Sequence, residues 1–163
     1  PPAPWTRPCA SLTPAERPGR TMPVLDLELR NDFADLSRAA RQANAALEAA
    51  GASAEAVYRA SLGLEEILTN IIKYGYDDQA EHRIAVRIEA GPESVRLAIA
   101  DDGHPFDPRQ APPPRLDRPL SERRAGGLGI HLVLAMMDRV DYRRQDGRNL
   151  LELTILPRPD PGD

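Results

Sequence analysis

The stretch from Glu66 to Tyr76 constrains the fold most, because its polar and apolar residues separate onto two sides of a helix. Glu66 and Asn70 lie four residues apart and Lys73 lies three further on, so all three project from one face. The opposite face is apolar and consists of Leu64, Ile67, Leu68, Ile71 and Ile72. The segment predicts an amphipathic helix that buries one side in a core and presents a carboxylate, an amide and an ammonium on the other.

Caps and alternation predict the other elements of the chain. Asn31 or Asp32 is placed to cap a helix over residues 33–50, and Ser53 is placed to cap the central helix, which stops at Gly75. We expect the apolar stripe of the earlier helix to consist of Phe33, Leu36, Ala40, Ala43 and Leu47. Alternating apolar and polar residues predict strands at residues 24–29, 83–89, 94–100, 141–144 and 149–156, and a last helix is expected at residues 127–139.

The order of these elements predicts the fold class. The second and third predicted strands, and the fourth and fifth, are joined by short glycine-containing turns, which is typical of antiparallel hairpins. Helices interleaved with hairpins predict an α+β two-layer sandwich, with helices on one face of a mixed, mostly antiparallel sheet. We expect one domain over residues 24–156, a proline-rich arm at residues 1–23 that holds no regular element, and a polar tail at residues 157–163.

Composition limits the partners and the compartment. The 163-residue chain has a formal net charge of −4, which argues against a nucleic acid or an anionic membrane as the main partner. Cys9 is the only cysteine, so we expect no intramolecular disulfide and no cysteine-based zinc site. No apolar run has transmembrane length, and the N-terminus lacks the apolar core of a signal peptide. These features predict a cytoplasmic protein.

The polar face of the central helix has the side chains that a magnesium–nucleotide site requires. Mg²⁺ prefers oxygen ligands and takes few from protein when phosphates are present, so the Asn70 amide would suffice. Lys73 would neutralise phosphate charge, and Glu66 would accept a proton from an attacking hydroxyl. The alternative is a solvated helix face on which Glu66 and Lys73 form an ordinary surface pair.

A second candidate motif, Asp101-Asp102-Gly103, follows the alternation of residues 94–100. A carboxylate at the end of a buried strand can accept a hydrogen bond from the exocyclic amine of adenine. Such a site disfavours guanine, which presents an acceptor at that position. Gly103 would allow the backbone to approach the base closely. The alternative is an ordinary Asp-Gly turn.

A third candidate motif, Gly126-Gly127-Leu128-Gly129, precedes the last predicted helix, where exposed N–H groups and the helix N-terminus favour phosphate. It matches neither the Walker pattern nor the dinucleotide-binding fingerprint. Residues 105–125, between the second and third motifs, are rich in proline and arginine. A long loop inside a compact domain is usually functional, so we expect an ATP lid over the phosphates; the alternative is a solvated insertion.

Three short patterns occur in order along the chain: Glu66-x-x-x-Asn70, Asp101-x-Gly103 and Gly127-x-Gly129. Their combination resembles the three boxes of the GHKL ATPase superfamily, which includes gyrase, Hsp90, histidine kinases and MutL. Residues 101–108 and 126–130 resemble the anti-sigma factor serine/threonine kinases of bacterial partner-switching systems. The resemblance covers about residues 24–156 and implies a Bergerat fold that binds ATP and Mg²⁺.

Residue by residue, the resemblance implies that Glu66 is the general base and that Asn70 is the magnesium ligand. It implies that Asp101 and Gly103 read adenine and that the glycines of residues 126–129 contact phosphate. The full candidate site consists of Glu66, Asn70, Lys73, Tyr74, Asp101, Gly103, Gly126, Gly127, Leu128, Gly129 and Ile130.

The resemblance implies an ATP-dependent protein serine/threonine kinase that is also an anti-sigma factor. The resemblance also implies that the protein is a homodimer. It would bind a sigma factor or another regulatory target and phosphorylate a STAS-type antagonist, without contacting nucleic acid or membrane directly. In the resembled kinases the first strand and helix lie at protein interfaces, which makes Arg38 and Arg41 candidate partner contacts.

Two alternatives remain open. A histidine-kinase-like catalytic domain has the same fold, although the sequence contains no dimerising helical hairpin with an acceptor histidine. A non-catalytic ATP-binding adaptor would switch partners without chemistry, and it would have no need of Glu66 as a base.

Overall fold

The computed structural model describes residues 22–113 and 127–158 of the chain. Most of the predicted arm, residues 114–125 of the predicted lid, Gly126 and the end of the tail lie outside the described residues. The elements, in chain order, are β1 (Met22–Arg30), α1 (Phe33–Ala49), α2 (Ala54–Tyr74), β2 (Arg83–Gly91), β3 (Ser94–Asp101), the 3-10 turn η2 (Pro108–Gln110), α3 (Gly127–Met136), β4 (Arg139–Gln145) and β5 (Arg148–Ile155).

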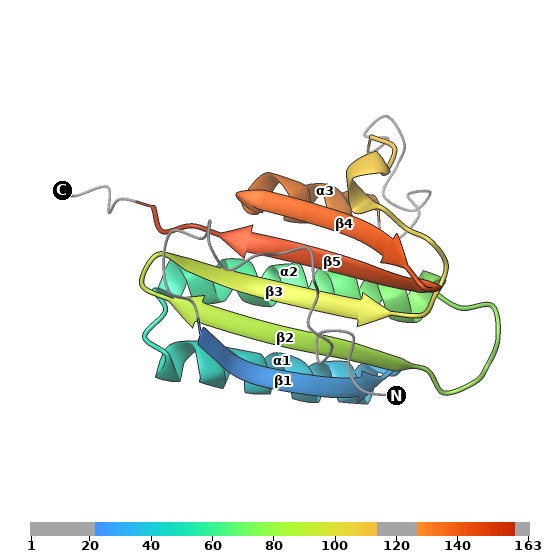
Figure 1. The fold of residues 1–163 in the computed structure, drawn as a ribbon, viewed down its shortest axis with the longest axis horizontal. Coiled ribbons are helices and arrows are strands. Elements are labelled where there is room, and N and C mark those ends of the chain that lie inside the picture. Colours follow the sequence, from blue (N-terminus) through green and yellow to red (C-terminus); the bar gives the residue numbers. More distant parts are fainter. Residues whose placement is uncertain (1–21, 114–126, 159–163) are drawn as a thin grey trace.

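The five strands form one sheet in the order β1-β2-β3-β5-β4, and the helices lie together on one of its faces (Figure 1). All four strand pairings among the described residues are antiparallel, so the expected mixed sheet is corrected to an antiparallel one. The β4–β5 turn places Asp146 and Gly147 at φ 51° and 76°, the two positive values that a type I′ hairpin turn requires. The α+β architecture of helices on one face of a sheet is confirmed.

The alanine-rich side of α1 packs against α2 and β1. Asp32 is the N-cap, because its side chain accepts a hydrogen bond from the Asp35 N–H at 2.8 Å. The predicted stripe is buried from Leu36 to Leu47, but Phe33 is 50% exposed, so its inclusion in the core was wrong. Phe33 is the first residue of α1, so no preceding turn of the helix covers its side chain.

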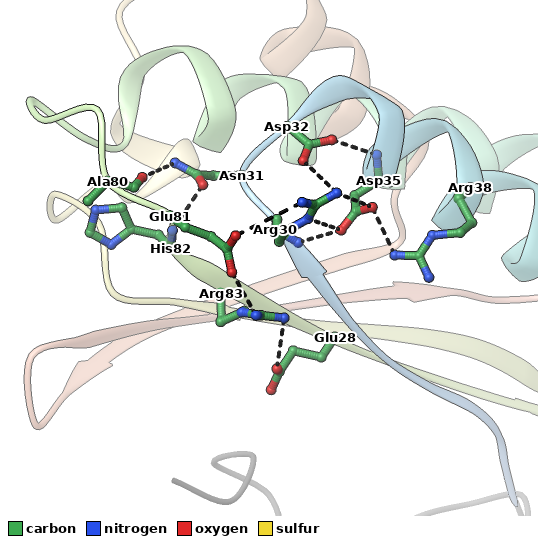
Figure 2. Close-up of polar contacts among 10 residues, drawn as sticks. All are labelled: Glu28, Arg30, Asn31, Asp32, Asp35, Arg38, Ala80, Glu81, His82 and Arg83. Carbon is green, nitrogen blue, oxygen red and sulfur yellow. Dashed lines mark hydrogen bonds and ion pairs between the residues drawn. The ribbon is translucent and has the colours of Figure 1, made fainter.

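The junction between β1, α1 and β2 is held by charged and polar side chains (Figure 2). Asp35 accepts hydrogen bonds from the backbone N–H of Arg30 at 2.9 Å and from its Nε at 3.2 Å, and it pairs with Arg38 at 3.0 Å. The hydrogen bonds from Arg30 lower the pKa of the Asp35 carboxyl. On the β2 side, the Asn31 side chain accepts from the His82 N–H at 2.9 Å. This junction fixes where α1 leaves the sheet.

α2 forms the central helix of the layer, as its sequence predicted. Ser53 is the N-cap and accepts from the Ala56 N–H at 3.2 Å, and Gly75 is the C-cap. The buried face of α2 contacts α1, α3, β3 and β5. The residues of that face are Ala60, Gly63, Leu64, Ile67, Leu68 and Ile71. The helix therefore carries Glu66 and Asn70 along the edge of the core rather than into it.

α3 ends at Met136 and β4 begins at Arg139, which corrects the predicted helix over residues 127–139. The buried guanidinium of Arg59, on α2, donates to the Met136 carbonyl through Nε at 2.8 Å and to Asp138 at 2.6 Å. The Asp138 carboxylate also accepts from the Leu156 N–H at 2.7 Å. The last helical carbonyl is thus occupied by a side chain from α2, and the chain turns into the edge strand.

Candidate nucleotide-binding site

A cavity of about 240 Å³ opens between α2 and the sheet. It is lined by Ile67, Asn70, Ile71, Tyr74, Gly75, Asp101, His104, Pro105, Phe106, Pro108, Tyr142, Asn149 and Leu151. These residues come from the second half of α2, from the end of β3 and the segment after it, and from β4 and β5. The cavity brings together three of the predicted site residues, Asn70, Tyr74 and Asp101. Its lining is largely apolar with a few polar groups, as small-molecule sites usually are.

Asp101 is the buried carboxylate of this cavity, with only 5% of the residue exposed. Its Oδ1 accepts hydrogen bonds from the Gly103 N–H at 2.8 Å and from Asn149 Nδ2 at 2.9 Å. Burial raises the pKa of the Asp101 carboxyl, and the two hydrogen bonds act in the opposite direction. A buried carboxylate that accepts two N–H donors is suited to accept a third from a ligand.

Gly103 packs against the C-terminal end of α2. A Cβ at this position would lie 2.6 Å from the Gly75 carbonyl oxygen and 2.9 Å from Asp101 Oδ1. The next residue, His104, donates its N–H to the same Gly75 carbonyl at 2.8 Å. The close approach that requires glycine at position 103 is therefore to the protein itself, because the turn after β3 must approach the end of α2.

Glu66 lies against the first turn of α3. A side chain at Gly129 would collide with the Glu66 carboxylate, so these two residues are in direct contact across the α2–α3 interface. Glu66 does not line the cavity, whereas Asn70, one turn further along α2, does. The first and third sequence motifs therefore meet where the second half of α2 contacts the first turn of α3, and the first and second meet at the cavity.

The other candidate residues occupy different surroundings. Lys73 is exposed and does not line the cavity, while Tyr74 does and is 51% exposed. Gly127 is the first residue of α3, Leu128 is 60% exposed, and Ile130 is buried in the core. Ile130 therefore contributes to packing, and the first turn of α3 is the part of the third motif that faces Glu66.

Sequence reasoning missed Asn149, Tyr142 and His104, which line the same cavity. Asn149 pairs with Asp101 across the β3–β5 ladder, so the two polar side chains lie next to each other on the helix side of the sheet. One signal was available. Asn149 is the polar member of an otherwise apolar inward row on β5 that continues with Leu151 and Leu153.

The segment between α2 and β2 contacts the turn after β3 through two imidazoles. The His82 ring stacks on Tyr76 at a centroid distance of 3.9 Å and lies 2.8 Å from Asp78 and 3.3 Å from Asp102. The hydrogen bond with Asp78 raises the pKa of His82. His104 lies 2.9 Å from Asp77 in the same region. These contacts support the turn that follows Asp101.

The donor set fits a magnesium nucleotide rather than a metal held by protein alone. Within residues 22–113 and 127–158, no group of three or more histidine, cysteine, aspartate or glutamate side chains could hold an ion. Asn70 offers one amide oxygen at the cavity, and Mg²⁺ bound to phosphates takes few protein ligands. Across the same residues, none of the helices is both long and apolar enough to cross a membrane.

Comparison with known proteins identifies relatives of the chain. The family model for the histidine kinase-like ATPase domain matches residues 29–155. Serine/threonine-protein kinase BtrW of Bordetella bronchiseptica is 33% identical over 108 residues, which cover 66% of this chain and 76% of that protein. Serine-protein kinase RsbW of Oceanobacillus iheyensis is 28% identical over 101 residues, which cover 60% of this chain and 64% of that protein.

A solved structure has the same fold. The crystal structure of the RsbU and RsbW domains of Rv1364c from Mycobacterium tuberculosis matches with a TM-score of 0.56 at 18% identity. The match covers 82% of this chain and 31% of that one. At this identity the likeness concerns the arrangement of helices and strands.

Proposed function

We propose that this chain, which belongs to the histidine kinase-like ATPase domain family, acts by partner switching. It is a protein serine/threonine kinase of the BtrW and RsbW type. In this proposal it binds a sigma factor or another regulatory target and phosphorylates a STAS-type antagonist of that binding. One observation supports it most. Glu66, Asn70, Asp101 and Gly129 come from three distant segments and lie along the second half of α2, with Asn70 and Asp101 at the cavity and Glu66 against Gly129.

Three of these residues, Asp101, Asn70 and Glu66, have separate tasks in the proposed reaction. Asp101 accepts a hydrogen bond from the adenine amine, and Asn70 provides an oxygen to the magnesium ion. Mg²⁺, when bound, neutralises charge on the phosphates. Glu66 accepts the proton of the substrate hydroxyl as the hydroxyl oxygen bonds to the γ-phosphorus. The bond from the γ-phosphorus to its bridging oxygen breaks, and ADP leaves.

The contact between Glu66 and Gly129 is the part of the geometry that favours catalysis over binding alone. A carboxylate beside the first turn of α3 lies where backbone N–H groups favour phosphate oxygens. An adaptor that only binds ATP needs no base at that place. We therefore place phosphotransfer where Glu66 of α2 meets the first turn of α3.

Label transfer from ATP tests the proposed function. The protein is incubated with γ-labelled ATP, Mg²⁺ and a candidate STAS-type protein, and the labelled residue is mapped. Phosphoserine or phosphothreonine on the added protein is the expected result. Label on a histidine would support the histidine-kinase alternative. Binding of ATP with no transfer to any candidate would support the adaptor. The elution volume of the protein in size-exclusion chromatography, with and without the partner, would test the proposed homodimer.

A further inference from the structure

Asn149 is joined by hydrogen bonds both to Asp101 and to two side chains of β4. Its Nδ2 donates to Asp101 Oδ1 at 2.9 Å and to the His104 carbonyl at 2.9 Å. Its Oδ1 accepts from the Tyr142 hydroxyl at 2.8 Å and from Arg144 Nη1 at 2.8 Å. Asn149 is only 5% exposed, and its amide has a partner on each side.

The chemistry of these neighbours allows only one orientation of the Asn149 amide. A guanidinium has donors and no acceptor, so the amide oxygen must face Arg144. A backbone carbonyl only accepts, so the amide nitrogen must face His104 and, with it, Asp101. Arg144 also donates to the Gly103 carbonyl at 2.9 Å, which fixes the guanidinium itself.

This orientation determines which oxygen of Asp101 is left for a ligand. Both hydrogen bonds that the described residues donate to Asp101 end on Oδ1, from Gly103 and from Asn149. Two donors on Oδ1 hold the carboxylate plane and keep that oxygen an acceptor. The ligand is left with Oδ2, whose direction is set by the same two bonds.

We propose that Asn149 is a positioning residue that determines base selectivity, and that Arg144 and Tyr142 set the orientation of its amide. Adenine presents an amine donor at position 6, and guanine presents a carbonyl acceptor there. A carboxylate fixed as an acceptor favours adenine. A carboxylate that can rotate, or that carries a proton toward the base, no longer excludes guanine. This inference rests on the proposed function, because it requires that the cavity binds the base of ATP.

The ratio of ATP affinity to GTP affinity tests the proposal, because general loosening of the cavity lowers both affinities together. Dissociation constants for both nucleotides with Mg²⁺ are measured by calorimetry on the full chain. Asn149→Leu, which keeps the branched shape of the side chain but removes the amide, is expected to lower the ratio about tenfold or more. Equal weakening of both nucleotides, with the ratio preserved, would overturn the proposal.

A second set of variants keeps Asn149 in place. Tyr142→Phe should change the ratio by less than about twofold, since Arg144 still fixes the amide. The double variant Tyr142→Phe with Arg144→Met removes both donors to the amide oxygen, so the amide is held through its nitrogen alone, and the ratio should fall toward that of Asn149→Leu. Arg143→Met is the matched control, because its side chain lies on the opposite face of β4. A double variant with the wild-type ratio contradicts the proposal even if Asn149→Leu does not fold.

The adenine site and the role of Asn149 would be contradicted by different results. A wild-type protein that binds neither nucleotide, or an Asp101→Asn variant with unchanged ATP affinity, would contradict the proposed adenine site itself. A wild-type protein that selects ATP through Asp101, but keeps that selectivity in Asn149→Leu, would contradict only the role of Asn149.

Discussion

At the scale of single residues, Asp101 gives the sharpest prediction for ATP binding. In Asp101→Asn the amide oxygen must face the two N–H donors from Gly103 and Asn149, which leaves the amide nitrogen toward the cavity. A donor then faces the donor amine of adenine, and ATP affinity should fall about tenfold. Titration calorimetry measures the change, with Asp102→Asn as the neighbouring control. Unchanged affinity in a folded Asp101→Asn protein would remove Asp101 from the site.

Glu66 gives the corresponding prediction for chemistry. Glu66→Gln keeps the shape that contacts Gly129 but cannot accept a proton at neutral pH. ATP binding should persist while phosphotransfer to the antagonist falls at least about 100-fold. Initial rates of label transfer measure this, and Glu65→Gln, the exposed neighbour on α2, should keep the wild-type rate. Transfer at the wild-type rate by Glu66→Gln would mean that another group is the base.

The sequence anticipated these residues because their placement depends on local periods. Helical spacing puts Glu66 and Asn70 on one face of α2, and alternation ends β3 at Asp101. Asn149 could not be found in the same way. Its role depends on the pairing of β3 with β5, and the hydrogen-bonded residues lie 48 positions apart in the chain.

At the scale of elements, Arg59 connects α2 to the end of α3 and to β5. Its guanidinium is buried and donates to the carbonyls of Met136 and Leu156 and to the Asp138 carboxylate. Arg59→Met leaves those acceptors without a partner, and the free energy of unfolding should fall by about 3 kcal/mol. Urea denaturation measures the loss. Arg139→Met, which removes an exposed partner of Asp141, should change it by less than about 1 kcal/mol. Equal effects of the two variants would mean that Arg59 does not hold α3.

The same residue explains why the predicted end of α3 was wrong. The local sequence pattern predicted that α3 continues to Arg139. The carbonyl of its last residue, Met136, accepts a hydrogen bond from Arg59, which lies 77 residues earlier in the chain. The first residues of α1 and α2 and the last residue of α2 were predicted correctly because the caps, Asp32, Ser53 and Gly75, are adjacent to the helices they end, while α1 ends at Ala49, one residue before its predicted end. Element ends set by neighbours in sequence are predictable, and those set by tertiary contacts are not.

At the scale of the whole molecule, the Arg30–Asp35 pair makes stability depend on acid pH. The pKa of Asp35 is lowered in the folded state by hydrogen bonds from Arg30, so its contribution is present above the unfolded value of about 3.9 and is lost as pH falls. Asp35→Asn should be less stable than the wild type at pH 7. The difference should shrink as the pH falls from about 4, which thermal unfolding across pH measures. Glu48→Gln, exposed on the same helix, is the control. A difference independent of pH would contradict the assignment.

The proposed partner surface lies on α1, away from the candidate nucleotide site, whose cavity has no lining residue from that helix. Arg38 pairs with Asp35 at 3.0 Å, so Arg38→Glu would also disturb the junction with β1. Arg41 is exposed one turn later and is the cleaner probe. Arg41→Glu should weaken binding to the sigma factor or the antagonist about tenfold while ATP affinity stays unchanged, because an arginine at an interface makes several charge-assisted bonds.

Pull-down with each partner and calorimetry with ATP measure the two effects of Arg41→Glu separately. Arg96→Glu, on the face of the sheet opposite the helices, reverses the same charge at a distant site and should retain both partners. Loss of partner binding by both variants would indicate a general charge effect. Full retention of both partners by Arg41→Glu would place the interface elsewhere. Loss confined to Arg41→Glu, with ATP affinity intact, would mean that one domain binds partner and nucleotide on separate surfaces, as partner switching requires.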